Sequence, residues 1–342
     1  MRRFAPPVVR SVASQLTGQS PAGSFHGVFC VCKPAGATSA NVVAALKKVI
    51  SPRATLEAPD RPRARYPDRR SASSSSGSVV RIGHGGTLDR LATGVLVIGV
   101  GHGTKQLQDF LASEKVYVAR GRLGVESPTY DLDGVKVDDL IHQPYGHVTL
   151  AGLESFLAEQ YRARIGGIVR QTPPLYSALK LDGKRLSGLA RAGKGDQVDL
   201  ERKRRDVQVY SIKVTDWQPP FYTVEVKCGA GFYVRSLVHD IGAHFACGSV
   251  LVDLRRTRQS GFALDQQHVL HMGHMRVTNE ACPDPAVDAA PASAAFHQAA
   301  AAAGGHHLAC TRDAIAEVLS IPLETRQAAV HTVKAGGTAA GV

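Results

Sequence analysis

The sequence predicts an α+β fold with one large, mixed and mostly antiparallel sheet flanked by helices. Strand-like segments outnumber helical ones along the chain, and several strands follow one another closely enough for antiparallel pairing. Strands and helices also do not alternate as they would in a series of βαβ units, so a doubly wound parallel sheet is not expected.

The first predicted unit is a strand, a turn and a helix within residues 27–50. Val28–Cys32 is a short apolar run with β-branched residues, and Lys33–Gly36 has the composition of a turn. Thr38 or Ser39 can cap the helix that follows.

Two segments near the start of the chain have the composition of disorder. Residues 51–78 are rich in Pro, Arg and Ser and almost lack large aliphatic residues, so we expect a disordered insertion there. Residues 1–24 carry arginines and serines but no acidic residue, and Glu57 is the first acid in the chain. That composition resembles a mitochondrial transit segment, and a basic disordered tail accounts for it equally well.

Regular structure is expected to resume at Val79. "GVLVIGV" predicts a buried strand, "TKQLQDFLAS" a short amphipathic helix, and "KVYVARGRLGV" a strand that alternates through Leu123. Residues 149–165 predict a helix, and "RDVQVYSIKVTDW" and "FYTVEVKCGAGFYVRSLVHDIG" predict more strands and another helix. One main domain therefore covers residues 25–270, followed by an alanine-rich tail at 271–342, in which "RDAIAEVLS" is the one expected helix.

Composition narrows the classes of function. The 342 residues carry a formal net charge of +12 and a sequence pI of about 9.6, so a polyanionic partner such as RNA or DNA is expected. Six cysteines without a CxxC pair favour free thiols in a reducing compartment over zinc or redox motifs. We interpret His268, His271 and His274 as surface residues, and no apolar run is long enough for a membrane span.

One stretch, "GHGGTLDRLATGVLVIGVGHGTK", combines many glycines with a single acid, Asp89. It contains neither a P-loop nor a GxGxxG fingerprint, so its glycines are expected to serve tight turns and close backbone approach. From the local sequence, Asp89 is either a turn residue that caps backbone N–H groups or a carboxylate held at the mouth of a cleft.

The chain resembles the TruB family of tRNA pseudouridine synthases, closest to its eukaryotic TRUB1/Pus4-type branch. Five blocks occur in the family's order and cover most of residues 27–262. They are "GVFCVCKPAGATSANVV", the Asp89 stretch quoted above, "KVYVARGRLGVESPTYDLDG", "QTPPLYSALKLDGKRLSGLARAG" and "GFYVRSLVHDIGAHFACGSVLVDLRRTRQSGF". The resemblance implies the pseudouridine synthase fold with an RNA-binding cleft, so that 25–270 is the catalytic domain.

The resemblance also assigns the reacting groups. Asp89 matches the family's aspartate nucleophile, and the reaction needs no cofactor and no metal. Arg235 in "GFYVRSL" matches the arginine that keeps the carboxylate ionised, although a surface strand residue is the plainer interpretation. Tyr117 in "KVYVA" matches the tyrosine that packs on the flipped base, whereas its sequence context alone favours a core or sheet-surface tyrosine.

Further positions are assigned to substrate binding by the same resemblance. His84 matches a histidine beside the flipped-out nucleotide, and Lys33 and Pro34 match a turn that supports the pocket. Tyr233, Leu254 and Arg255 fall in blocks that line the pocket. Residues 171–200 match the RNA-gripping insertion, whose basic residues are expected to hold phosphates and include Lys180, Lys184 and Arg185.

The implied partner is the T arm of tRNA, with the uridine at tRNA position 55 as the target. Two alternatives stay open: a tRNA-folding chaperone in which Asp89 is incidental, and a synthase acting on mRNA sites shaped like a T loop. We further expect a monomer without membrane association, located in the nucleus, the mitochondrion or the cytoplasm. Residues 271–342 show no clear PUA-domain pattern, which favours an enzyme that works without a guide RNA.

Overall fold

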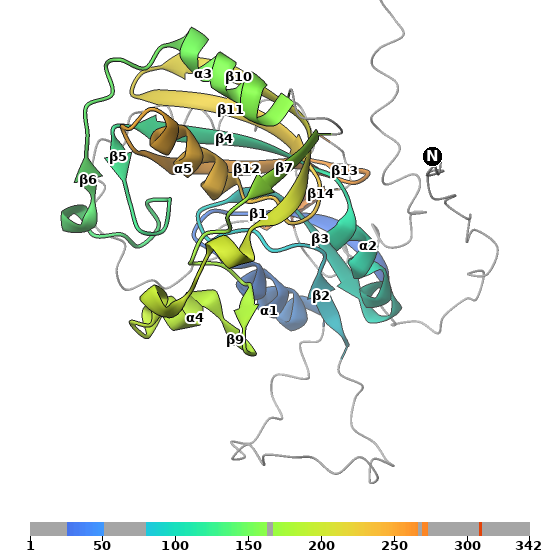
Figure 1. Ribbon diagram of the computed structural model, residues 1–342. Coiled ribbons are helices and arrows are strands. Elements are labelled where there is room, and N and C mark those ends of the chain that lie inside the picture. Colours follow the sequence, from blue (N-terminus) through green and yellow to red (C-terminus); the bar gives the residue numbers. More distant parts are fainter. Residues whose placement is uncertain (1–25, 51–79, 163–166, 266–268, 273–307, 310–342) are drawn as a thin grey trace, which may run out of the picture.

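The computed structural model describes residues 26–50, 80–162, 167–265, 269–272 and 308–309 (Figure 1). The predicted insertion at 51–78, residues 1–24 and almost all of the tail at 271–342 lie outside these ranges. Within the described ranges, no helix is long and apolar enough to cross a membrane. No group of three or more His, Cys, Asp or Glu side chains in the same ranges could hold a metal ion.

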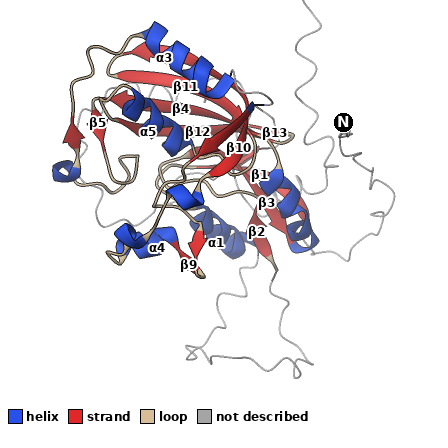
Figure 2. Ribbon diagram, viewed as in Figure 1, coloured by secondary structure: helices blue, strands red, loops and turns tan. Residues whose placement is uncertain are grey.

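An eleven-stranded sheet organises the described residues (Figure 2). Its path runs β15-β14-β1-β3-β12-β4-β11-β10-β7, with β13 paired to β12 and β2 paired to β3. Only β1·β14, β14·β15 and β12·β3 are parallel among the pairs in this sheet. The predicted mixed, mostly antiparallel sheet is therefore confirmed. The strands are β1 (Gly27–Lys33), β2 (Ile82–His84), β3 (Thr93–Val100), β4 (Lys115–Leu123), β7 (Ile168–Gln171), β10 (Arg205–Gln218), β11 (Phe221–Cys228), β12 (Ser249–Gln259), β13 (Phe262–Ala263), β14 (Val269–His271) and β15 (Leu308–Ala309).

Two small two-stranded sheets stand apart from this sheet. The first pairs β5 (Val125–Glu126) with β6 (Ile141–His142), which follows after a long connection, and the second is a hairpin of β8 (Lys180–Leu181) and β9 (Lys184–Arg185). The hairpin leads directly into α4 (Leu186–Arg191) within the predicted RNA-gripping insertion.

Helices cover both faces of the sheet. Apolar residues of α1 (Ser39–Ile50), α3 (Leu150–Leu157) and α5 (Val234–His244) share one large core with one face of the sheet. The other face packs against α2 (Leu107–Ala112) in a smaller core. In β1, Phe29 and Val31 face the large core while Val28 and Cys30 face the small one, which is the alternation that a strand requires.

The helices predicted before residue 270 are present, and two of them are shorter than expected, while the helix expected at "RDAIAEVLS" lies outside the described residues. The helix expected at 149–165 is α3 followed by a π-helical turn at Ala158–Arg162, and 163–166 lies outside the described residues. The helix expected from Thr104 begins as a 3₁₀ segment at Gly101–Gln106 before α2. Thr38 rather than Ser39 caps α1, since its hydroxyl accepts a hydrogen bond from the Asn41 N–H at 3.1 Å.

Two glycines of the Asp89 stretch permit close backbone approach, as the sequence predicted. Gly94 has φ +105°, and a Cβ atom there would strike the backbone of Arg256 on the neighbouring strand β12. A Cβ atom on Gly103 would collide with the carbonyl of Gly27. The first contact lets β3 pair closely with β12, and the second brings the 3₁₀ segment after β3 against the start of β1.

Candidate active site

The loop that carries Asp89, between β2 and β3, is tied to the turn that follows β1. The Ser39 hydroxyl donates to the Leu88 carbonyl at 3.3 Å and accepts from the Leu88 N–H at 2.9 Å. The Gly36 N–H donates to the Arg90 carbonyl at 2.9 Å. Because the residues on either side of Asp89 are both held in this way, the position of the carboxylate is set by the sheet and α1.

Lys33 also binds the Asp89 loop, through a buried ammonium group. Its side chain is fully buried, and its ammonium donates to the carbonyls of Pro34 at 2.8 Å, Ala37 at 2.6 Å and Arg90 at 3.3 Å. Burial lowers the pKa of Lys33 to about 8. A fully buried amine cannot reach RNA, so Lys33 acts on the site by supporting the Asp89 loop and the turn that contains Pro34, in keeping with the supporting turn expected from the sequence.

Asp89 forms a two-point ion pair with Arg235. Arg235 Nε donates to Asp89 Oδ2 at 3.0 Å, and Nη2 donates to Oδ1 at 3.2 Å. The side chain of Arg235 is only 5% exposed, whereas that of Asp89 is 36% exposed. The pairing predicted from the sequence is present, with the cation inside and the carboxylate open to solvent.

Arg235 is fixed by two further segments of the chain. Its Nη1 donates to the Thr129 carbonyl at 3.0 Å, and its Nη2 also donates to the Tyr176 carbonyl at 2.9 Å. Thr129 follows the β5 strand, and Tyr176 belongs to the insertion at 171–200. The guanidinium therefore joins α5, the Asp89 loop and the insertion at one point.

A second carboxylate, Asp131, lies beside the same arginine and was not singled out from the sequence. Its Oδ2 is 3.6 Å from Arg235 Nε, and its side chain is 7% exposed. Asp131 Oδ1 accepts from the Thr129 hydroxyl at 2.8 Å and from the Asp133 N–H at 3.2 Å. Burial raises the pKa of Asp131 to about 6, despite the opposing effect of Arg235. The two aspartates in "TYDLDG" are candidate partners for Arg235, but the local sequence does not show which of them contacts it.

Tyr117 lies under the loop in contact with a buried arginine that sequence reasoning also missed. Arg256 is 1% exposed and donates to the Val95 carbonyl at 2.7 Å, the Gly86 carbonyl at 3.0 Å and the Tyr117 hydroxyl at 3.4 Å. Tyr117 is 8% exposed, and burial raises the pKa of its hydroxyl. Arg256 therefore connects Tyr117 to the glycine turn that precedes Asp89.

His84 stands on β2 near the same arginine. Burial and the charge of Arg256 lower its pKa, so the ring is neutral at pH 7. Its Nδ1 atom is buried and has no hydrogen-bond partner among the described residues. Because this nitrogen is enclosed, only the remaining, half-buried part of the ring is open to a bound molecule.

The other predicted pocket residues differ in accessibility. Tyr233 is half-buried and held by Gln171, which accepts from its N–H at 2.8 Å and donates to its carbonyl at 2.9 Å, while Arg205 lies over its ring. Leu254 is 4% exposed, so it has little surface to offer a ligand. Arg255 is half-buried, and burial lowers its pKa.

Lys180, Lys184 and Arg185 are brought together by the β8–β9 hairpin. Lys180 pairs with Arg185 across the hairpin, and all three side chains are exposed. None of the three has an ion-pair partner within 4.0 Å among the described residues. The β8–β9 hairpin therefore presents three exposed cations that form no ion pair within the described residues.

Comparisons with known proteins show which family the chain is similar to. The model of the TruB family pseudouridylate synthase N-terminal domain matches residues 75–234. Pseudouridylate synthase TRUB1 of Mus musculus is 42% identical over 248 residues, which cover 72% of this chain and 66% of that protein. The Homo sapiens protein of the same name is 40% identical, covering 71% and 63%. The matched part of the chain thus spans slightly less than two thirds of these two relatives.

One further protein and one solved structure are also similar to the chain. The tRNA pseudouridine synthase B of Synechococcus elongatus (strain ATCC 33912 / PCC 7942 / FACHB-805) is 36% identical over 246 residues, covering 71% of this chain and 70% of that protein. Among solved structures, a chain of a Cbf5-Nop10-Gar1 complex is 25% identical, with a TM-score of 0.47, over 75% of this chain and 59% of that chain.

Proposed function

The chain belongs to the TruB family of pseudouridylate synthases, and from this premise we propose that it isomerises the T-loop uridine of tRNA, at tRNA position 55, to pseudouridine. The observation that carries the proposal is the ion pair between Asp89 and Arg235, in which the arginine is 5% exposed and the carboxylate 36% exposed. A buried cation favours the ionised carboxylate, and an exposed carboxylate can be reached by a nucleoside.

The reaction follows from this geometry as an internal exchange of bonds. An oxygen of Asp89 adds to the target nucleoside, and the bond between uracil N1 and ribose C1′ breaks. The uracil turns in the pocket, and a bond forms between C5 and C1′ as the bond to the Asp89 oxygen breaks and the carboxylate is released. C5 loses its proton and N1 gains one. Every heavy atom of the substrate is retained in the product and the proton count is unchanged, so the exchange balances without a co-reactant.

The target uridine has to leave the base stack of the folded RNA before it can react. Tyr117 provides the aromatic surface on which the flipped base is expected to rest, and His84 contributes its half-buried ring. The exposed hairpin cations Lys184 and Arg185 are suited to phosphates, which fix register while the T-loop shape selects the uridine. We further propose that the protein acts as a monomer.

The direct test is pseudouridine mapping on unmodified tRNA incubated with the protein. The parent should convert the T-loop uridine, and Asp89→Asn should not, while both bind the tRNA. Absence of product at that uridine in correctly folded tRNA would refute the proposal. Equal promotion of tRNA folding by the parent and Asp89→Asn, without isomerisation by either, would favour the chaperone alternative.

We also propose mRNA as a second class of substrate, because the T loop is recognised by its shape and phosphates. An mRNA segment folded like a T loop would present the same splayed bases and phosphates to Asp89 and the hairpin. Transcriptome-wide mapping in cells that lack the protein should reveal such sites, each in a T-loop-like structure. Loss confined to tRNA would restrict the activity to tRNA.

A further inference from the structure

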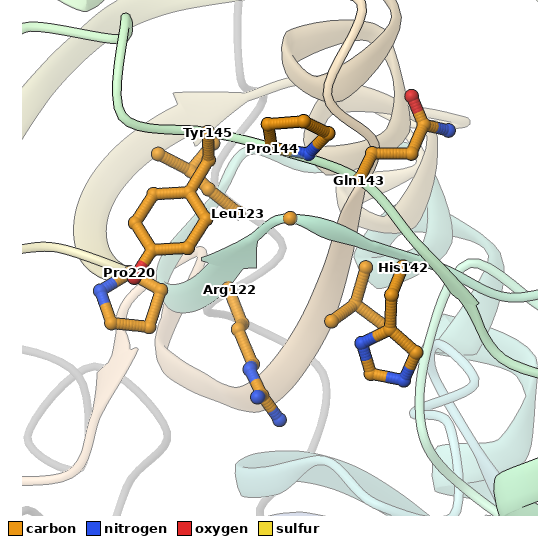
Figure 3. A pocket seen from close by; sticks show the side chains of 9 residues that line it. Arg122, Leu123, His142, Gln143, Pro144, Tyr145 and Pro220 are labelled. Atoms are coloured by element: carbon orange, nitrogen blue, oxygen red, sulfur yellow. The ribbon is translucent and has the colours of Figure 1, made fainter.

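The loop at residues 127–134, "SPTYDLDG", follows β5 and belongs to the candidate active site. Leu123, at the end of β4, lines a cavity of about 300 Å³ (Figure 3), but none of residues 127–134 lines it. The loop instead lies against Arg235, to which it presents the Thr129 carbonyl and the Asp131 carboxylate. The contacts that fix this loop therefore determine where two of the groups around Arg235 lie.

Asp133 ties the 127–134 loop to the residue that follows the proposed nucleophile. Arg90 Nε donates to Asp133 Oδ1 at 2.9 Å and to Oδ2 at 3.1 Å. The backbone of Arg90 is held as well, because its carbonyl accepts from Lys33 Nζ at 3.3 Å and from the Gly36 N–H at 2.9 Å. Arg90 is thus bound to the turn after β1 by its main chain and to the 127–134 loop by its side chain.

These contacts close a ring of interactions that begins and ends at Asp89. Arg235 binds the Asp89 carboxylate and lies 3.6 Å from Asp131 Oδ2. Asp131 Oδ1 in turn accepts from the Asp133 N–H at 3.2 Å. The Asp133 carboxylate binds Arg90, which is the next residue in the chain after Asp89. A shift of Asp133 relative to Arg90 would therefore also displace groups that hold Arg235.

The Arg90–Asp133 pair differs from a phosphate-binding site. The two side chains are 33% and 24% exposed, so solvent screens their attraction and the pair contributes little to the stability of the whole fold. The charge of Arg90 is already compensated by a carboxylate, which weakens its attraction for a phosphate. Lys184 and Arg185 of the β8–β9 hairpin, by contrast, form no ion pair within the described residues.

We propose that Arg90 and Asp133 are positioning residues for the isomerisation. Their ion pair fixes the 127–134 loop against the Asp89 loop, so that Arg235 meets Asp89 in the two-point geometry, and neither side chain touches the substrate. Misplacement of a reacting group by about 1 Å can lower a rate about 100-fold, so a pair of little consequence for stability can still determine the rate. This inference rests on the proposed function, because a positioning effect is measured as a rate of isomerisation.

The test measures pseudouridine formation in single turnovers, at saturating unmodified tRNA, for Arg90→Gln, Asp133→Asn and the double variant. Each single variant should lower the rate about 10-fold or more, whereas the Kd for tRNA and its salt dependence should keep the parental values. Because both variants break the same contact, the double variant should be about as slow as the slower single variant. Arg90→Lys keeps a cation opposite Asp133 and should recover part of the rate.

Lys227→Gln is the matched control. Lys227 Nζ lies 2.9 Å from Glu114 Oε2, and these side chains are 38% and 39% exposed, so the pair resembles Arg90–Asp133 in length and in accessibility. It joins β11 to the segment after α2 and takes no part in the ring around Asp89. Its loss should leave both the rate and the binding of tRNA unchanged.

The outcomes separate this inference from the proposed function. A parent that forms no pseudouridine would refute the proposed function and this inference with it. With an active parent, parental rates for Arg90→Gln and Asp133→Asn would refute the positioning role alone. Fully additive losses, or losses matched by unfolding of the variants at the assay temperature in a circular dichroism melt, would also refute it.

A direct contact between Arg90 and RNA has its own signature. In that case Arg90→Gln would weaken tRNA binding and lower the slope of log affinity against log salt by about 0.7–0.9, the loss of one phosphate contact. Asp133→Asn would leave the rate unchanged, since it would only release the arginine. This combination would overturn the positioning role and assign Arg90 to the RNA interface.

Discussion

Arg235 donates to both carboxylate oxygens of Asp89, and of the two partners it is the arginine that is buried. The guanidinium also donates to the carbonyls of Thr129 and Tyr176. These four hydrogen bonds exceed the three donors of a lysine ammonium, whereas a guanidinium has five donors in a fixed plane. The choice of arginine is therefore a structural requirement as well as an electrostatic one.

The first prediction concerns Arg235→Lys. A lysine keeps the charge but cannot form the paired contact to Asp89 while also reaching both carbonyls, so we expect at least about a 100-fold loss in single-turnover rate. tRNA binding through the hairpin should persist, as measured by filter binding. Asp89→Asn is the companion variant, with intact folding and no product. A near-parental rate for Arg235→Lys, or for Arg235→Ala at neutral pH, would show that the pair is dispensable.

The second prediction concerns Asp131 and pH. Its folded-state pKa of about 6 lies above the ordinary value of 3.8, so between about pH 4 and 6 the folded state binds more protons than the unfolded state. The contribution of Asp131 to stability is present below about pH 4 and is lost as pH rises towards 6, by about 2–3 kcal/mol. Asp131→Asn, whose Oδ1 can still accept from Thr129, should remove this dependence.

Urea denaturation at a series of pH values measures the effect. The free energy of unfolding of Asp131→Asn relative to the parent should rise between pH 4 and 6 and then level off. A constant difference over this range would mean that Asp131 does not titrate there.

The sheet was largely predictable because its strands have strong local signals. β3 is apolar on both faces. In β4 alternate residues face the large core, and the other side carries Val116 and Val118 followed by Arg120 and Arg122. β12 was not predicted as a strand, since "VDLRRTRQ" looks like an exposed basic segment. Only its position between β3 and β4 explains why Arg256 is buried there.

Site residues could be predicted where a family motif contains them. Contacts between residues that are distant in the sequence could not be predicted. Asp89 and Arg235 are 146 residues apart, and the family's blocks identified both. Arg255 and Arg256 are adjacent and point to opposite faces of β12, but alternation alone does not say which of them faces Tyr117. Likewise, burial of Lys33 depends on the loop that closes over it, which its own sequence context does not reveal.

The third prediction concerns Arg256 as a positioning residue for Tyr117 and the Gly86 turn. Arg256→Met should lower the rate of isomerisation by about 10- to 100-fold, because both the tyrosine hydroxyl and the Gly86 carbonyl lose their donor. The KM for tRNA should change little, since Arg256 is buried and cannot reach RNA. Arg256→Lys should recover part of the rate.

A double-mutant cycle with Tyr117→Phe distinguishes positioning from general stability. If Arg256 acts through the tyrosine hydroxyl, the losses in rate caused by Arg256→Met and Tyr117→Phe should be less than additive. Fully additive losses, or a loss of thermal stability that accounts for the inactivity, would contradict the positioning role.

The last prediction concerns the hairpin formed by β8 and β9. Lys184 and Arg185 are exposed and unpaired, so their contacts with phosphates should depend steeply on salt through counterion release. Neutralising both with glutamine should lower the salt slope of tRNA binding by about two units and weaken affinity, without changing which uridine is modified. Lys47→Gln with Lys48→Gln, in the last turn of α1, is a control of equal charge. An unchanged slope in the hairpin variant would remove the hairpin from the RNA interface. If a different uridine were modified, Lys184 and Arg185 would determine which uridine reaches Asp89, and the pocket around Asp89 would not.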